Sequence, residues 1–151
     1  MAKVEAKLSE MGLKIPPPPR EIGNYVGAVT TGNLVFVSGH APWIEDEVIK
    51  GKLGRDMDVP EGRHAAQVVI LNALASLKAE IGDLDRVKRV VKVLGMVNCT
   101  GDFVDTPQVI DGASDVLTEA FGEAGKHSRS AVGFSSLPMG MAVEIEMTVE
   151  I

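Results

Sequence analysis

The chain has 151 residues, of which 45% are hydrophobic, 24% charged and 4% aromatic, and its formal net charge is −6. This composition predicts one globular domain, and the acidic balance and scarce aromatics argue against a protein that binds nucleic-acid phosphates or stacks bases. Cys99, the single cysteine, excludes an intrachain disulfide, and we find neither an apolar signal-peptide core nor a membrane-spanning run, so we expect a cytoplasmic protein.

The first segment predicts a short helix followed by an extended connection. Val4, Leu8 and Met11 follow helical spacing and Gly12 suits a helix end. Four prolines at 16–19 enforce polyproline geometry. We interpret residues 1–19 as a helical arm and proline-rich linker outside the core, and residues 20–151 as a single domain.

A hairpin and a long helix follow. The β-branched runs at 28–31 and 34–37 flank Gly32 and Asn33, which suit a tight turn. From Trp43 to Asp58 we expect a loop with a short strand near Val48. Asp58 and Pro60 then open a helix whose apolar stripe continues to Gly82.

The second half predicts a strand, a helix and two closing strands. Residues 87–98 form a β-branched run, and Thr106 is predicted to cap a helix that reaches residue 121. A strand at 129–137, a turn at 138–140 and strict alternation over 143–151 predict a terminal hairpin. The fold class is therefore α+β, a mixed sheet with two helices packed on one face.

Few motifs carry chemistry. The stretch GEAGKHS lacks the spacing of a phosphate loop, and the three histidines have no partners at metal-ligand spacing. We therefore predict no dedicated metal site. Cys99 is interpreted as a small, half-buried residue and not as a nucleophile.

A charge constellation on the closing strands remains. Arg129 stands at the start of one strand, and Glu144, Glu146 and Glu150 share a face of the next. An arginine fork can bind a carboxylate bidentately. From the pattern alone, Arg129 is either a structural ion pair at the end of a strand or an anchor for an anionic ligand.

The closing segment RSAVGFSSLPMGMAVEIE resembles the signature of the Rid family of reactive-intermediate deaminases, also called the YjgF or L-PSP family. Upstream, NYVGAVTTGNLVFVSGHAP and VNCTGDF are similar to two further family segments. The resemblance covers residues 23–151. It implies a chorismate mutase-like fold in which three subunits form a homotrimeric barrel, with pockets between neighbouring subunits.

The resemblance also implies an activity, namely hydrolytic deamination of small enamines and imines such as 2-aminoacrylate to a 2-oxo acid and ammonia. In that reaction Arg129 would anchor the substrate carboxylate and Glu144 would orient the attacking water. By the same resemblance, Tyr25, Ser38, Gly39 and the backbone of Ala131 would bind the substrate. No cofactor, nucleic acid or membrane is implied as a partner.

Departures from the family pattern leave alternatives open. Many members carry cysteine at the position of Ala131 and glutamine at that of His40, and the segments 43–60 and 102–126 are longer than in a compact member. The family also includes members described as ribonucleases. A trimer that binds small carboxylates without turnover, and an endoribonuclease, are the alternative functions.

Overall fold

Five strands form one sheet in the order β1-β2-β7-β5-β6, in a computed structural model that describes residues 2–151. β5 and β6 are parallel and the other neighbours are antiparallel, so the sheet is mixed. The strand bounds are β1 (Ala28–Thr31), β2 (Leu34–His40), β5 (Arg89–Asn98), β6 (Ser128–Phe134) and β7 (Val143–Glu150).

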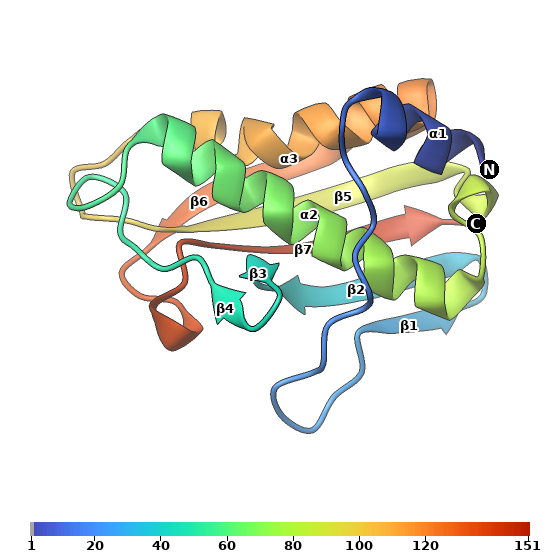
Figure 1. Ribbon diagram of the computed structural model, residues 1–151, viewed down its shortest axis with the longest axis horizontal. Coiled ribbons are helices and arrows are strands. Elements are labelled where there is room, and N and C mark those ends of the chain that lie inside the picture. The colour runs from blue at the N-terminus through green and yellow to red at the C-terminus, as the bar shows by residue number, and fades with distance from the viewer. Residues whose placement is uncertain (1) are drawn as a thin grey trace.

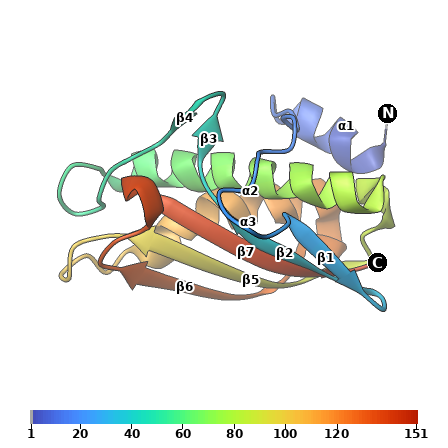
Figure 2. The ribbon, with the colours of Figure 1, turned by 90° about the horizontal axis from the view of Figure 1, so that it is seen from below.

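Two long helices, α2 (Val59–Ile81) and α3 (Thr106–Phe121), cover one face of this sheet, as Figures 1 and 2 show. The predicted helices are thus confirmed. Asp58 and Glu61 form a reciprocal capping box at the start of α2, and Gly82 ends it with φ +88°. Thr106 does not cap α3 as predicted, because its hydroxyl donates to the carbonyl of Ala131 on β6.

The first hairpin is confirmed, but the terminal hairpin is wrong. β1 pairs with β2 through the predicted turn. β6 and β7 do not pair: β7 lies between β2 and β5, and β6 pairs with the outer edge of β5. The segment β5–α3–β6 is a crossover unit, which brings β6 back parallel to β5. The residues after β6 must then pass β5 before β7 begins.

A glycine in β5 lets α3 approach the sheet closely. A Cβ at Gly95 would come within 2.6 Å of two atoms of the Ile110 side chain, so a larger residue would push α3 outwards. Gly95 pairs with Ala131 of β6. This contact sets the height of α3 above the edge strand and therefore above Arg129.

The N-terminal segment forms α1 (Lys3–Glu10), which lies on the outer side of the helix layer (Figure 2). Val4 and Leu8 are buried in the main core, where we had predicted an arm outside it. The Asp85 carboxylate accepts hydrogen bonds from the N–H groups of Lys3 and Val4, at 2.8 and 3.0 Å. These contacts, Val4 first, hold the pKa of Asp85 below its ordinary value. The division at residue 19 stays a prediction.

The segment between β2 and α2 contains a small second sheet. The strand expected near Val48 is present as β4 (Glu47–Val48), which pairs with β3 (Trp43–Ile44) through a two-residue turn. Three short helical turns complete the fold, η1 (Leu84–Arg86), η2 (Gly122–Gly125) and η3 (Pro138–Gly140). None of the described helices combines the length and apolar character needed to cross a bilayer.

Replacing Leu8 tests whether α1 is part of the core. Leu8 is fully buried, so Leu8→Ala should lower the free energy of unfolding by about 2–5 kcal/mol in urea denaturation. Glu10→Ala, at an exposed position of the same helix, serves as the control and should change it by less than about 0.5 kcal/mol. Equal, small effects of both variants would mean that α1 does not contribute to the core.

Candidate functional site

The predicted site residues lie in two separate places within one chain. Tyr25, Ser38, Gly39 and Glu144 line a common pocket of about 500 Å³ at the end of β2 and the start of β7. Arg129 and Ala131 do not line it, because they lie on β6, and β5 stands between β6 and β7. The chain alone therefore brings four of the six predicted residues together. We call the cavity beside Glu144 the carboxylate pocket.

A bulge at the end of β2 shapes the carboxylate pocket. Val37 pairs with Met147 and His40 with Ile145, so Ser38 and Gly39 together stand opposite the single residue Glu146. Bulges of this kind redirect side chains beside active sites. A Cβ on Gly39 would overlap the Glu144 carboxylate. Glycine is therefore required here for the carboxylate to occupy its position.

Glu144 is the half-buried acid of this pocket. Within residues 2–151 it has neither a side-chain hydrogen bond nor an ion pair. Burial raises the pKa of Glu144 above its ordinary value, and the neighbouring Glu146 raises it further. A carboxylate in this state is a better proton acceptor than one exposed to water.

Tyr25 and Ser38 form a wall of the carboxylate pocket together with the segment before β1. The Ser38 hydroxyl donates to the carbonyl of Val26 at 2.6 Å, and the Tyr25 hydroxyl accepts from the N–H of Ile22 at 3.3 Å. Glu21 accepts from the N–H of Gly27 at 3.2 Å. The wall is thus a loop that closes on itself by hydrogen bonds.

His40 and Ser76 also line the carboxylate pocket, and sequence reasoning did not assign them to it. His40 Nδ1 lies 2.5 Å from the carbonyl oxygen of Ser38, and Nε2 lies 2.7 Å from Ser76 Oγ. Because a carbonyl can only accept, Nδ1 carries the proton and neutral His40 accepts from Ser76. Burial lowers the pKa of His40, against smaller opposing effects of Ser38 and Glu21. The imidazole is therefore neutral at pH 7.

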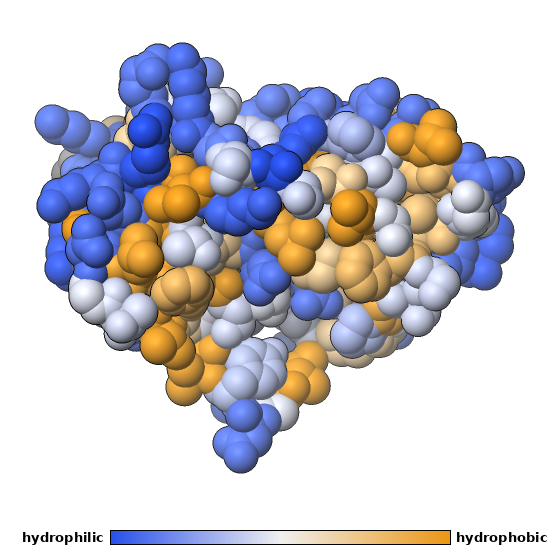
Figure 3. Space-filling model, turned by 180° about the vertical axis from the view of Figure 1, so that it is seen from behind, coloured by the Kyte–Doolittle hydropathy of each residue, from blue (hydrophilic) through white to orange (hydrophobic). Residues whose placement is uncertain are grey.

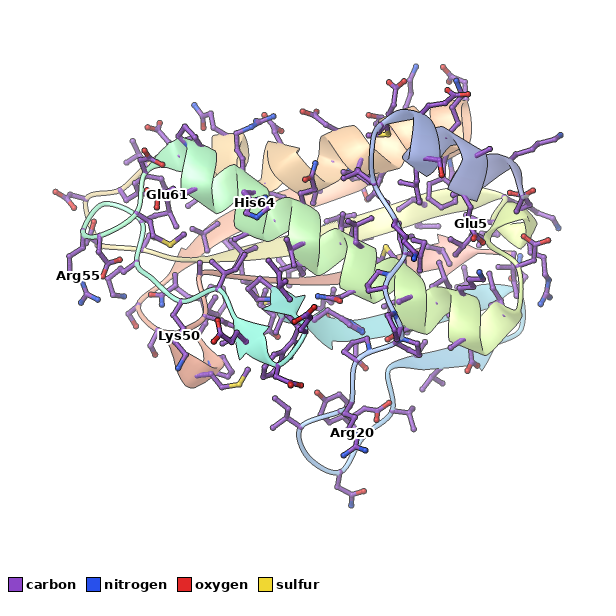
Figure 4. The ribbon with its side chains drawn as sticks, viewed as in Figure 1. Glu5, Arg20, Lys50, Arg55, Glu61 and His64 are labelled. Atoms are coloured by element: carbon purple, nitrogen blue, oxygen red, sulfur yellow. The ribbon has the colours of Figure 1, made fainter. Side chains whose placement is uncertain are left out.

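No local signal identifies the Ser76–His40 pair. Ser76 lies in the C-terminal third of α2 and is 36 residues from His40. His64, in contrast, is exposed on the outer surface of α2, as Figure 4 shows. Among the described residues, no three His, Cys, Asp or Glu side chains are grouped so that they could hold a metal ion.

In the single chain, Arg129 makes the ion pair that its position at the strand end suggested. Its Nη1 donates to Asp111 Oδ1 at 2.6 Å and to Ser114 Oγ at 3.2 Å, both on α3. His127 Nε2 contacts the same Ser114 hydroxyl at 2.9 Å. Arg129 Nε and Nη2 have no hydrogen bond within residues 2–151. One edge of the guanidinium is thus available for a further ligand.

Comparison with known proteins places the fold and the sequence in a family. The model described as "YjgF/chorismate_mutase-like, putative endoribonuclease" matches residues 5–150. Protein TCP17 of Trypanosoma cruzi is 40% identical over 153 residues, which span 99% of this chain and 94% of TCP17. The chain therefore belongs to the YjgF/RidA/L-PSP family with the chorismate mutase-like fold, as its sequence indicated.

Two solved structures of similar proteins differ in how closely they match this chain. Atu1372 from Agrobacterium tumefaciens, a protein of unknown function, is 40% identical with a TM-score of 0.91 and covers 99% of this chain and 92% of its own. RidA from an Antarctic Psychrobacter is 27% identical with a TM-score of 0.63, covering 89% and 94%. The chain thus resembles Atu1372 more closely than it resembles RidA.

Removing the Glu144 charge should stabilise the folded chain. Because the pKa of Glu144 is raised, the folded state holds its proton to higher pH than the unfolded state does, and ionisation costs stability as the pH rises above the ordinary value of 4.5. Glu144→Gln should therefore raise the Tm at pH 7, and the difference should vanish near pH 4. Tm measured from pH 3.5 to 7 checks this.

The control is Glu146→Gln, at an exposed position of the same strand and face. It should raise the Tm by less than Glu144→Gln does. A Tm difference for Glu144→Gln that is the same at pH 4 and pH 7 would show that desolvation of the charge is not its cause.

Proposed function

We propose that the chain is a hydrolytic deaminase of small reactive enamine and imine acids of the 2-aminoacrylate type, giving a 2-oxo acid and ammonia. The observation that supports this most is Glu144, a half-buried carboxylate without a partner in a pocket next to Gly39 and Ser38. Membership of the family that contains RidA supports the same reaction class. Unpaired buried carboxylates are costly and are retained where chemistry needs them.

The chemistry needs one base and one anion anchor. Glu144 would accept a proton from water as the water oxygen bonds to the imine carbon and the C=N electron pair moves to nitrogen. Glu144 returns this proton to the nitrogen, which gives a carbinolamine. The C–N bond then breaks as the new C=O forms and the hydroxyl proton passes through Glu144 to the nitrogen, so ammonia leaves with both protons of the water. Arg129 would bind the substrate carboxylate through Nε and Nη2, and the Ala131 backbone would add a donor.

This assignment requires more than one copy of the chain, because Arg129 and Glu144 are separated by β5. We infer a homotrimer in which β6 of one copy meets the carboxylate pocket of the next. The uncovered face of the sheet fits such contacts. Figure 3 shows orange apolar side chains on both sides of a blue hydrophilic band on this face, and its exposed apolar residues include Val29, Phe36, Val132 and Phe134.

Two alternative functions can be distinguished from the deaminase by whether the protein turns over an imine substrate. A trimer that only binds small carboxylates would use the same Arg129 but release no product. An endoribonuclease is the activity in the family model's description. The net charge of −6 disfavours it, because RNA binding needs a positive surface.

A substrate assay with three variants tests the proposal. An amino-acid oxidase generates 2-iminopropanoate from alanine, and semicarbazide competes for the imine, so a deaminase lowers the semicarbazone yield. Arg129→Ala should lower kcat/KM about 100-fold or more, because two charge-assisted hydrogen bonds are lost. Asp111→Ala breaks the same ion pair but keeps the guanidinium, and should stay within about threefold.

Arg63→Ala is the matched control, since Arg63 also pairs with a carboxylate of α3, Asp115 at 2.8 Å, but lies outside the site. Equal losses for Arg129→Ala and Asp111→Ala would assign Arg129 a structural role only. Absence of any effect of the wild type on semicarbazone yield would exclude this substrate class.

Two exposed apolar residues test the homotrimer. Phe134 on β6 is 41% exposed and lies on the uncovered sheet face, and Val104, 79% exposed, lies in the loop before α3. Phe134→Asp should dissociate the assembly in sedimentation-velocity runs, because it places a charge in an apolar contact. Val104→Asp should leave the assembly intact. A wild-type monomer at all concentrations would contradict the trimer and with it the shared pocket.

A further inference from the structure

The carboxylate pocket adjoins a larger, mostly apolar cavity. This second cavity has a volume of about 810 Å³, and four residues line both spaces: Pro19, Arg20, Ile22 and Trp43. The two spaces are therefore neighbours that share a wall, not separate depressions on the surface. We call the second cavity the proline trough.

Apolar side chains from three parts of the chain build the proline trough. The polyproline segment forms one side, Trp43 and Ile44 of β3 form the end next to the carboxylate pocket, and Val68 and Leu71 of α2 form the floor. Charged residues of the lining are Lys14, Arg20, Glu45 and Asp46. Figure 4 shows Arg20 on the loop that joins the polyproline segment to β1.

The walls of the trough are held in place before any ligand binds. The Asn72 side chain, buried on α2, donates to the carbonyls of Ala41 and Trp43 at 3.1 and 3.0 Å, which ties β3 to the helix. The four prolines restrict their own backbone. A preformed apolar cavity binds an apolar group with little ordering cost.

We propose that the proline trough receives the side chain of the substrate, and that the preferred substrates are 2-imino acids with a large apolar or aromatic side chain. The inference rests on the proposed function for the reacting end of the molecule. With the imine carbon near Glu144, the shared residues Trp43 and Ile22 lead the side chain away from the acidic end of the pocket. Burial of each added methylene then favours binding, and an aromatic side chain can pack against Trp43.

A three-carbon substrate leaves the trough empty and gains nothing from it. A charged side chain would lose its hydration in this mostly apolar cavity, and the two cations and two anions of the lining give no net charge to offset that cost. The trough therefore selects neutral, bulky side chains of the leucine or phenylalanine kind.

The test compares the imines of alanine, leucine and phenylalanine in the semicarbazide assay. We expect kcat/KM for the leucine and phenylalanine imines to exceed that for the alanine imine at least tenfold. Leu71→Ala, on the trough floor and outside the carboxylate pocket, should reduce this preference severalfold and leave the alanine imine unchanged. Trp43→Ala should reduce this preference more strongly and, because Trp43 also lines the carboxylate pocket, should lower the rate for the alanine imine as well. Val104→Ala, in neither cavity, should change none of the three rates.

A second measurement tests binding in the trough independently of catalysis. Calorimetric titration of the wild type with pyruvate, 4-methyl-2-oxopentanoate and phenylpyruvate should give the tighter binding to the two larger acids, and Leu71→Ala should remove part of the difference. If no imine is turned over but this order of affinity holds, the deaminase proposal fails and the trough assignment stands. Two results would overturn the assignment. One is that the alanine imine is turned over, and pyruvate is bound, at least as well as the larger compounds. The other is that no 2-oxo acid binds.

Discussion

The alternation of β7 is the constraint on which both the core and the site depend. Val143, Ile145, Met147 and Val149 face the helices and are buried, while the glutamates between them face the uncovered side. β7 pairs with β2 on one edge and with β5 on the other, so its register positions the whole sheet. A slip of one residue would put carboxylates into the core, which is why this register is strongly specified. The position of Glu144 in its pocket follows from packing on the opposite face.

Local patterns were sufficient to predict the elements but not all of their neighbours. Periodicity and capping residues predicted α2, α3 and the first hairpin, because these signals depend on residues close in the sequence. The turn after β6 exists as η3, yet β6 and β7 are not paired. A turn signal does not tell whether the chain folds back on itself or passes a neighbouring strand. Here the crossover through α3 places β6 beside β5, and β7 occupies the position between β5 and β2.

The site, too, could be predicted from the sequence only where its residues do not depend on long-range packing. The family signature led to Ser38, Gly39 and Glu144, whose common pocket depends on one bulge between adjacent strands. The partners of Arg129 could not be predicted, because Asp111 and Ser114 reach it only through the packing of α3 on the sheet. Contacts of this kind depend on the distance between a helix and a strand, here set at Gly95, and no spacing in the sequence encodes that distance.

The charges of the carboxylate pocket support the proposed assembly of more than one copy. The carboxylate pocket holds Glu21, Glu144 and Glu146, while His40 is neutral and Arg20 is the only cation among the described residues that line it. An anionic substrate that entered this pocket alone would meet like charge in a partly desolvated place, which is unfavourable. A guanidinium supplied from β6 of a second copy would offset that repulsion. It would also favour the ionised form of Glu144, so that the base becomes charged where the anion is bound. In the proposed assembly, Arg129 as anchor and Glu144 as base would lie on separate strands and would not pair with each other within one chain.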